Sequence, residues 1–110
     1  MKRKKDSLQD ALPLLVLKIL ARRGALHGYG ITTVIQSMSE ERLRPEEGSL
    51  YPALHRLEEQ GWVAAEWQTT ENNRRARVYS ITVKGRKELA AVEARWRTAS
   101  AAILQVLQRA

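Results

Sequence analysis

The sequence predicts a mainly α fold with one small β-hairpin, an α+β arrangement, on three observations. Apolar residues recur at helical spacing in three successive segments between residues 8 and 60. Residues 63–68 and 75–81 resemble strands and flank a short polar tip, which is the pattern of a hairpin. An apolar seam then continues in steps of three and four to residue 106. This order predicts a winged helix-turn-helix followed by a long C-terminal dimerisation helix.

The composition limits the class of protein. A chain of 110 residues forms one domain with a modest core, and such domains often complete their core by pairing with another chain. The absence of cysteine excludes disulfides and thiolate zinc sites. No signal peptide or membrane span is expected, because Lys2–Lys5 precede polar residues and the apolar run Ala11–Leu17 is too short. We therefore expect a cytoplasmic protein.

The charge favours an acidic partner such as nucleic acid, since the net charge is +7 and the pI about 10.3. The distribution weakens this argument, because residues 46–60 carry more acidic than basic groups. We expect a DNA-binding domain over residues 1–82 and a dimerisation helix over residues 83–110. Residues 1–7 form a basic tail, either a solvated end or an arm that touches phosphate.

The first helix is expected to begin near Asp10, which is a good N-cap, or earlier with a kink near Pro13. Gly24 ends it after two arginines. Its buried side is predicted to consist of Leu12, Leu15, Val16 and Ile19, widened by Leu8, Leu14 and Leu20.

The second helix is expected from about Tyr29 to Ser39. Its inward side chains are predicted to be Ile31, Val34, Ile35 and Met38. The polar segment Glu40–Arg44 follows, in which Leu43 could form a short pairing strand or a packed turn.

The stretch from Gly48 to Trp62 is predicted to hold the helix that reads DNA. Its apolar stripe is Leu50, Ala53, Leu54 and Leu57. Its other side carries groups that suit phosphates and base edges, namely Ser49, Tyr51, Pro52, His55 and Arg56. An ordinary amphipathic helix explains the pattern equally well. Pro52 predicts either a distorted first turn after Pro45 or a helix capped by Ser49.

The hairpin tip, Thr69–Arg74, contains Asn72 and Asn73, which tolerate left-handed backbone. Trp62 and Trp67 are interpreted as hairpin packing. Three arginines follow the tip, and they are predicted either to contact phosphate or the minor groove or to form a solvated cluster that prevents aggregation: Arg74, Arg75 and Arg77.

The last helix is predicted to be capped by Thr82 and to run from Val83 to near Ala110. Its seam is too long for a domain of this size to bury on itself, so we expect it to pair with another copy of the chain, helped by the first helix. The alternative is a helix that folds back on its own domain. The seam consists of Leu89, Val92, Trp96, Ala99, Ile103 and Val106.

Four blocks of the sequence resemble the PadR family of bacterial transcriptional regulators, in its shorter branch. The blocks are His27–Ile31, Gly48–Glu58, Gly61–Trp62 and Arg74–Thr82 with Gly85. The resemblance covers the chain from Leu8 to its end. It implies a homodimeric repressor that binds a palindromic operator in double-stranded DNA and is often released by a small aromatic or hydrophobic effector.

The resemblance also assigns roles to residues. The DNA-binding positions that it implies are Tyr29, Ser49, Tyr51, Pro52, His55, Arg56, Arg74, Arg75 and Arg77. Trp96 matches a tryptophan that lines a drug-binding pore in some members, although a seam aromatic needs no ligand. The family often carries Gly-Gly at the wing tip, so Asn72 and Asn73 are predicted to give a stiffer or differently aimed tip.

No enzyme is expected. The two histidines lie on separate elements, and neither a catalytic triad, a phosphate loop nor a metal-ligand spacing is present, so no metal or cofactor is predicted. Two other functions stay open. One is a winged-helix interaction module that docks an acidic protein, and the other is a ligand sensor with weak DNA contact.

Overall fold

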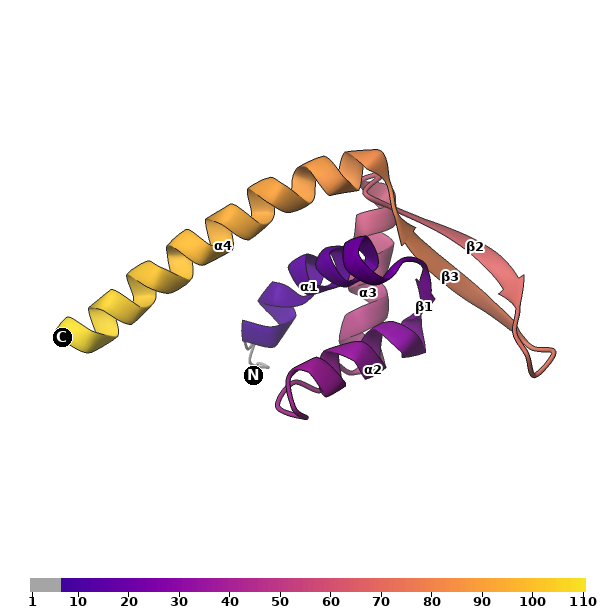
Figure 1. Cartoon of the computed structure of the whole chain (residues 1–110), viewed down its shortest axis with the longest axis horizontal. Coiled ribbons are helices and arrows are strands. Elements are labelled where there is room, and N and C mark those ends of the chain that lie inside the picture. The colour runs from indigo at the N-terminus through magenta and orange to yellow at the C-terminus, as the bar shows by residue number, and fades with distance from the viewer. Residues whose placement is uncertain (1–6) are drawn as a thin grey trace.

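A computed structural model describes residues 7–110, with side chains from residue 10 onward (Figure 1). The predicted basic tail lies outside the described residues except for Ser7, which already belongs to the first helix. The elements in chain order are α1 (Ser7–Arg23), β1 (Leu26–His27), α2 (Gly28–Met38), α3 (Glu47–Glu59), β2 (Val63–Thr69), β3 (Arg75–Ile81) and α4 (Val83–Arg109).

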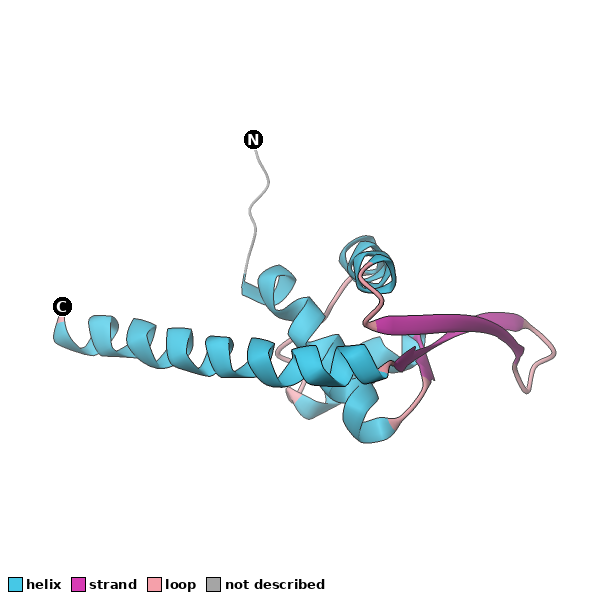
Figure 2. Ribbon diagram, turned by 90° about the horizontal axis from the view of Figure 1, so that it is seen from above, coloured by secondary structure: helices cyan, strands magenta, loops and turns pink. Residues whose placement is uncertain are grey.

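Helices α1, α2 and α3 form a compact body from which two elements project in different directions (Figure 1). The β2–β3 hairpin extends from one end, and the distal half of α4 extends from the other (Figure 2). The strands form an antiparallel sheet in the order β1-β3-β2, with Trp67 paired to Arg77 across the hairpin. This arrangement confirms the predicted winged helix-turn-helix with a long last helix.

The core lies between the three helices of the body, the base of the hairpin and the start of α4. Among residues 10–110, the apolar residues buried there are fourteen: Leu12, Val16, Leu17, Ile19, Leu20, Ile31, Ile35, Leu50, Ala53, Leu54, Leu57, Val63, Tyr79 and Leu89. Two expectations were wrong. Leu17 is fully buried although the predicted stripe omitted it, because α1 is covered on more than one side. Met38 is 64% exposed, because it is the last residue of α2 and only one side of it faces α1.

The helix starts decide between the alternatives that the sequence left open. Helix α1 begins at Ser7 and contains Pro13, which is the earlier of the two predicted starts and not the one at Asp10. Helix α3 begins at Glu47 after the N-cap Glu46 and contains Pro52. Of the two predicted alternatives, the start soon after Pro45 is therefore correct and the cap by Ser49 is wrong. The amide of Leu50 still donates to the Glu46 carbonyl at 2.9 Å, which shows that the helical turn is already formed before Ser49.

The sheet contains one strand besides the hairpin, namely β1. Its residues Leu26 and His27 pair with Tyr79 and Val78 of β3. The sequence did not identify it, because two residues carry too little alternation to indicate a strand. The segment around Leu43 is a packed turn, which was one of the two predicted alternatives. The turn residues Gly24, Gly61 and Asn73 adopt positive φ, as glycine and asparagine most readily do.

Within the described part of the chain, no helix combines the length and apolar character that crossing a membrane requires.

Helix α4 is tied to α1 by an ion pair near the middle of its length. Lys18 Nζ lies 2.9 Å from Glu93, whose other carboxylate oxygen lies 2.6 Å from Arg97. The hydrogen bonds from Lys18 and then Arg97 hold the pKa of Glu93 below its ordinary value of 4.5. A carboxylate whose pKa falls on folding stabilises the native state above the unfolded value, and this contribution disappears as the pH falls through the folded pKa.

The Glu93→Gln variant should therefore be less stable than the parent at pH 7. The difference should shrink as the pH drops below about 4.5, where Glu93 becomes protonated in both the unfolded and, at lower pH, the folded state. Urea unfolding at pH 7 and at low pH measures this difference. The exposed wing-tip variant Glu71→Gln is the control, and a Glu93→Gln difference that persists undiminished in acid would contradict the assignment.

Candidate nucleic-acid interface

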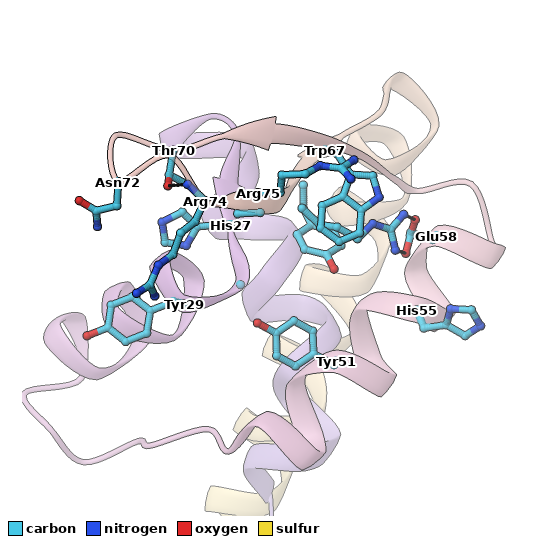
Figure 3. A pocket seen from close by; sticks show the side chains of 14 residues that line it. His27, Tyr29, Tyr51, His55, Glu58, Trp67, Thr70, Asn72, Arg74 and Arg75 are labelled. Carbon is cyan, nitrogen blue, oxygen red and sulfur yellow. Dashed lines mark hydrogen bonds and ion pairs between the residues drawn. The ribbon is translucent and has the colours of Figure 1, made fainter.

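A groove of about 920 Å³ lies between the hairpin, the exposed side of α3 and the start of α2 (Figure 3). It brings together six of the nine DNA-binding residues predicted from the sequence: Tyr29, Tyr51, His55, Arg74, Arg75 and Arg77. The other three, Ser49, Pro52 and Arg56, lie on α3 outside this lining. The groove therefore lies between α3, which is the predicted reading helix, and the β2–β3 hairpin, which is the predicted wing.

The start of α2 is organised by His27, a residue to which the sequence analysis gave no positioning role. Its Nδ1 accepts a hydrogen bond from the Gly30 amide at 3.0 Å and so caps the helix. Its ring stacks on Tyr29, with 6.2 Å between ring centroids. Tyr29 remains 74% exposed, so its hydroxyl is available at the edge of the groove.

Tyr51 packs against the start of α2 through Gly28. A Cβ at Gly28 would lie only 2.5 Å from the Tyr51 hydroxyl, so the absence of a side chain there is what admits the tyrosine ring. Tyr51 is nevertheless 42% exposed, and Figure 3 shows its hydroxyl directed toward the groove. The contact fixes the first turns of α3 against α2, which is the geometry that a helix-turn-helix requires.

The two sides of α3 divide as the sequence predicts. Leu50, Ala53, Leu54 and Leu57 are each at most 2% exposed. On the opposite side, Pro52, His55 and Arg56 are exposed and Ser49 is half-buried. His55 Nε2 lies 3.2 Å from the Glu59 carboxylate one turn further along the helix. The exposed side of α3 thus carries side chains of the kind that can meet base edges.

The wing carries its arginines in two different settings. Arg74 is exposed at the tip, in the turn where the Thr70 amide donates to the Arg74 carbonyl at 2.7 Å. The Arg75 guanidinium stacks over Trp67 at 4.8 Å from the ring centroid. Stacking holds the guanidinium in place and leaves its N–H groups free to donate to another group. Trp67 is 56% exposed, so the hairpin packing predicted for it covers less than half of the side chain.

Arg77 lies on the inner side of the hairpin. Its guanidinium forms two hydrogen bonds to Glu58 of α3, at 2.9 and 3.5 Å. It also lies 5.9 Å from the Trp67 ring centroid and 5.8 Å from that of Tyr79. Burial raises the pKa of Tyr79, and the positive charge of Arg77 partly offsets this effect. Arg77 is therefore already paired within the chain, unlike Arg74 and Arg75.

The sequence pattern of the family described as transcriptional regulator PadR-like matches residues 16–91, well over half of the chain. The chain belongs to the PadR-like family. The resemblance carried by the four sequence blocks is thereby confirmed. Members are transcriptional regulators and not enzymes, which agrees with the expectation for this chain.

Solved structures of similar proteins show the same fold. A PadR family regulator from Eggerthella lenta is 30% identical, with a TM-score of 0.76 over 94% of this chain and 88% of that one. A transcriptional regulator from Clostridium thermocellum is 26% identical, with a TM-score of 0.82 over 92% of this chain and 97% of that one.

Two curated proteins are similar in sequence. A transcriptional regulator from Mycobacterium tuberculosis is 41% identical over 64 residues, which cover 58% of this chain and 56% of the relative. An uncharacterized 37.1 kDa protein in a transposon of Streptomyces fradiae is 43% identical over 76 residues, 69% of this chain and 20% of that protein. The matched region thus spans about a fifth of one relative and just over half of the other.

In this PadR-like chain the predicted seam of α4 divides into two parts. Leu89 is 8% exposed and belongs to the chain's own core, whereas Val92 and Trp96 are half-buried. Ala99 is exposed, and Ile103 and Val106 are 59% and 65% exposed. The distal half of α4 therefore presents large apolar side chains that are more than half exposed.

A second groove, of about 560 Å³, lies between α1 and α4 of the PadR-like chain. Trp96 lines it, together with Leu14, Leu15, Lys18, Glu93, Arg97, Ser100, Ala101 and Leu104. Its wall is mainly apolar, with charged groups at the Lys18–Glu93 pair. Trp96 is thus neither a core residue nor fully solvated.

Proposed function

We propose that this PadR-like chain is a cytoplasmic, homodimeric repressor that binds a palindromic operator in double-stranded DNA. Residues 1–82 bind DNA and residues 83–110 dimerise. The exposed side of α3 enters the major groove, where Ser49, Pro52, His55 and Arg56 meet base edges and phosphates. The wing follows the flanking backbone through Arg74 and Arg75, and Tyr29 and Tyr51 donate to phosphates between the two.

The observation that carries this proposal is the groove between α3 and the wing. Tyrosine hydroxyls and arginine guanidinia from three separate elements line it, and both groups donate hydrogen bonds to phosphate oxygens. The acidic balance of α3 weighs little against an anion there, since Glu58 is paired with Arg77 and neither Glu47 nor Glu59 lines the groove. A backbone phosphate therefore meets mainly donors.

The proposed dimer rests on the distal half of α4. Ile103, Leu104, Val106 and Leu107 are each at least 56% exposed, and together they form an apolar stripe on a helix that extends away from the body. Leaving such a stripe in water is unfavourable, and a second copy of the same helix would cover it at heptad spacing. Two paired α4 helices would hold two α3 helices at a fixed separation, as a palindrome requires.

Release by an effector is the last part of the proposal. The groove beside Trp96 has room for a flat aromatic or hydrophobic molecule, and it lies where α4 leaves α1. Binding there would alter the angle of α4 and the separation of the two α3 helices. Quenching of tryptophan fluorescence by planar dyes, retained in a Trp62→Phe, Trp67→Phe variant, tests it. Quenching that vanishes in that variant would contradict the role of Trp96.

A binding selection from random duplexes, followed by fluorescence anisotropy on the recovered sequences, tests the proposed function. The expected result is a palindromic site bound by two chains, much more tightly than unrelated duplex at moderate salt. Absence of any sequence preference would overturn the repressor assignment. Salt-sensitive capture of an acidic protein without duplex binding would favour the alternative interaction module.

Replacing Arg75 by alanine should weaken binding to every duplex by roughly tenfold, because a phosphate contact carries no sequence information. The slope of log affinity against log salt should fall by about one per subunit. Arg109→Ala, which removes the same charge at the far end of α4, is the matched control and should change neither quantity appreciably. A change in sequence preference alone would show that Arg75 contacts bases.

A further inference from the structure

The Glu58–Arg77 pair is the ion pair that joins the wing to the reading helix. Among the salt bridges of residues 7–110, it alone links the hairpin to α3. The two side chains are 21% and 38% exposed, so solvent screens the pair only in part. The geometry is two-pronged, which fixes the direction of the guanidinium as well as its distance.

The Arg77 guanidinium also lies close to two aromatic rings of the sheet. Trp67 of β2 and Tyr79 of β3 each lie within 6 Å of it. Its Nε is buried and has no hydrogen-bond partner in the described residues, which indicates that the packing of the side chain outweighs the loss of one hydrogen bond. Arg77 thus connects both strands of the hairpin to α3.

The contact lies at a level of the hairpin from which it can set the direction of the outer part of the ribbon. Trp67 pairs with Arg77 in the β2–β3 register, so the ring contacts and the ion pair lie at one level. Residues 68–76 lie beyond that level, and this part of the ribbon projects from the body (Figure 1). A two-stranded ribbon twists and bends readily when nothing covers it. A contact at residue 77 therefore sets the direction in which Arg74 and Arg75 point.

We propose that Arg77 is a positioning residue, and that its pairing with Glu58 fixes the angle between the wing and α3 at which both elements reach one DNA duplex. This inference rests on the proposed DNA-binding function and assigns Arg77 a role other than the DNA contact predicted from the sequence. Because Glu58 and two rings already surround the guanidinium, a phosphate would have to displace an internal partner to reach it.

The Glu58→Gln variant separates this role from a direct contact by the sign of its effect. Removing a carboxylate from a DNA-facing surface should strengthen binding through electrostatics alone. The positioning role predicts the opposite, a loss of DNA affinity of about fivefold. Without the ion pair the wing is less ordered in the free protein, so more conformational entropy is lost on binding. Glu66→Gln removes the same charge from the opposite face of β2 and should bind as well as the parent or slightly better.

The pair should also behave as one unit. Arg77→Gln should weaken binding to a similar degree with an unchanged salt slope, and the double variant should be no weaker than either single variant. Thermal unfolding of each variant, measured by circular dichroism, checks that every protein is folded at the assay temperature. A salt slope reduced by about one per subunit in Arg77→Gln would overturn the proposal, since it would show that Arg77 contacts phosphate.

The wing angle can be measured without DNA. The chain has no cysteine, so spin labels at Glu71→Cys on the tip and Gln60→Cys at the end of α3 report one distance. Labelled chains mixed with excess unlabelled chains keep the measurement within one subunit. The distribution of label-to-label distances should be narrow in the parent and in Glu66→Gln, and broader in Glu58→Gln. An unchanged distribution in Glu58→Gln would overturn the positioning role even if the parent binds DNA.

The two proposals fail in different ways. If the parent protein binds no duplex, the proposed function is wrong, whereas the label distances still decide whether Glu58 and Arg77 fix the wing. If the parent binds an operator and Glu58→Gln binds it as tightly, the function stands and the positioning role is wrong.

Discussion

Replacing Gly85 by alanine should destabilise the protein more than any other single methyl group added to a glycine. The new Cβ would overlap the carbonyl oxygen of Trp62 and lie 2.8 Å from Cγ1 of Ile81. That carbonyl cannot turn away freely, because it accepts a hydrogen bond from the Thr82 amide at 3.0 Å. Helix α4 must therefore move away from the base of the hairpin.

The expected cost is about 3 kcal/mol of unfolding free energy, at the upper end for an overpacked site. This corresponds to a fall in melting temperature on the order of 15 °C for a domain of this size. Differential scanning calorimetry measures both quantities at a fixed protein concentration, since dimerisation would make the melting temperature concentration-dependent.

Gly48 provides the matched control for this substitution. It also lies in a helix, but a Cβ there would meet nothing within 4 Å. Gly48→Ala should raise stability by roughly 0.5–1 kcal/mol, because alanine loses less conformational freedom in a helix. Equal effects of the two substitutions would show that the contact between Gly85 and Trp62 is not as tight as described.

The Ile103→Glu, Val106→Glu double variant should abolish tight operator binding while leaving the domain folded. Both side chains are exposed in the single chain, so a carboxylate there costs little in the monomer. In the proposed dimer four carboxylates would be buried against one another, which strongly opposes association. Loss of the second reading helix should then reduce operator affinity by roughly 100-fold or more.

Sedimentation equilibrium at micromolar concentration measures the oligomeric state, and anisotropy titration measures the affinity. Gln105→Glu adds a single carboxylate on another side of α4 and should leave the oligomeric state and the affinity unchanged. A double variant that remains dimeric and binds the operator normally would show that the apolar stripe of α4 is not the dimer interface.

Local periodicity was sufficient to predict most of the fold. The apolar stripe of α3 and the alternation of β2 and β3 indicate the buried side directly, because helices and strands repeat at different periods. The cap at Thr82 was also predicted, and its side chain accepts from the Gly85 amide at 2.9 Å. A cap depends on residues three positions apart, so the sequence contains the whole interaction.

For the candidate interface, the sequence predicted residues that belong to it but not how they contact one another. Motif resemblance named Tyr29, Tyr51 and the wing arginines, and the fold brings these residues to one groove. It gave no indication that Trp67 would stack with Arg75. Stacking of this kind depends on the register and twist of the hairpin, which no short motif records.

The sequence by itself determined the order, type and approximate bounds of the helices and the hairpin, because each follows from residues close together in the chain. Only the tertiary structure decided which partners the side chains meet. Glu58 and Arg77 are 19 positions apart, and Gly28 receives Tyr51 from a different helix. Such pairs form when separate elements pack, so their geometry depends on the whole core and not on any local pattern.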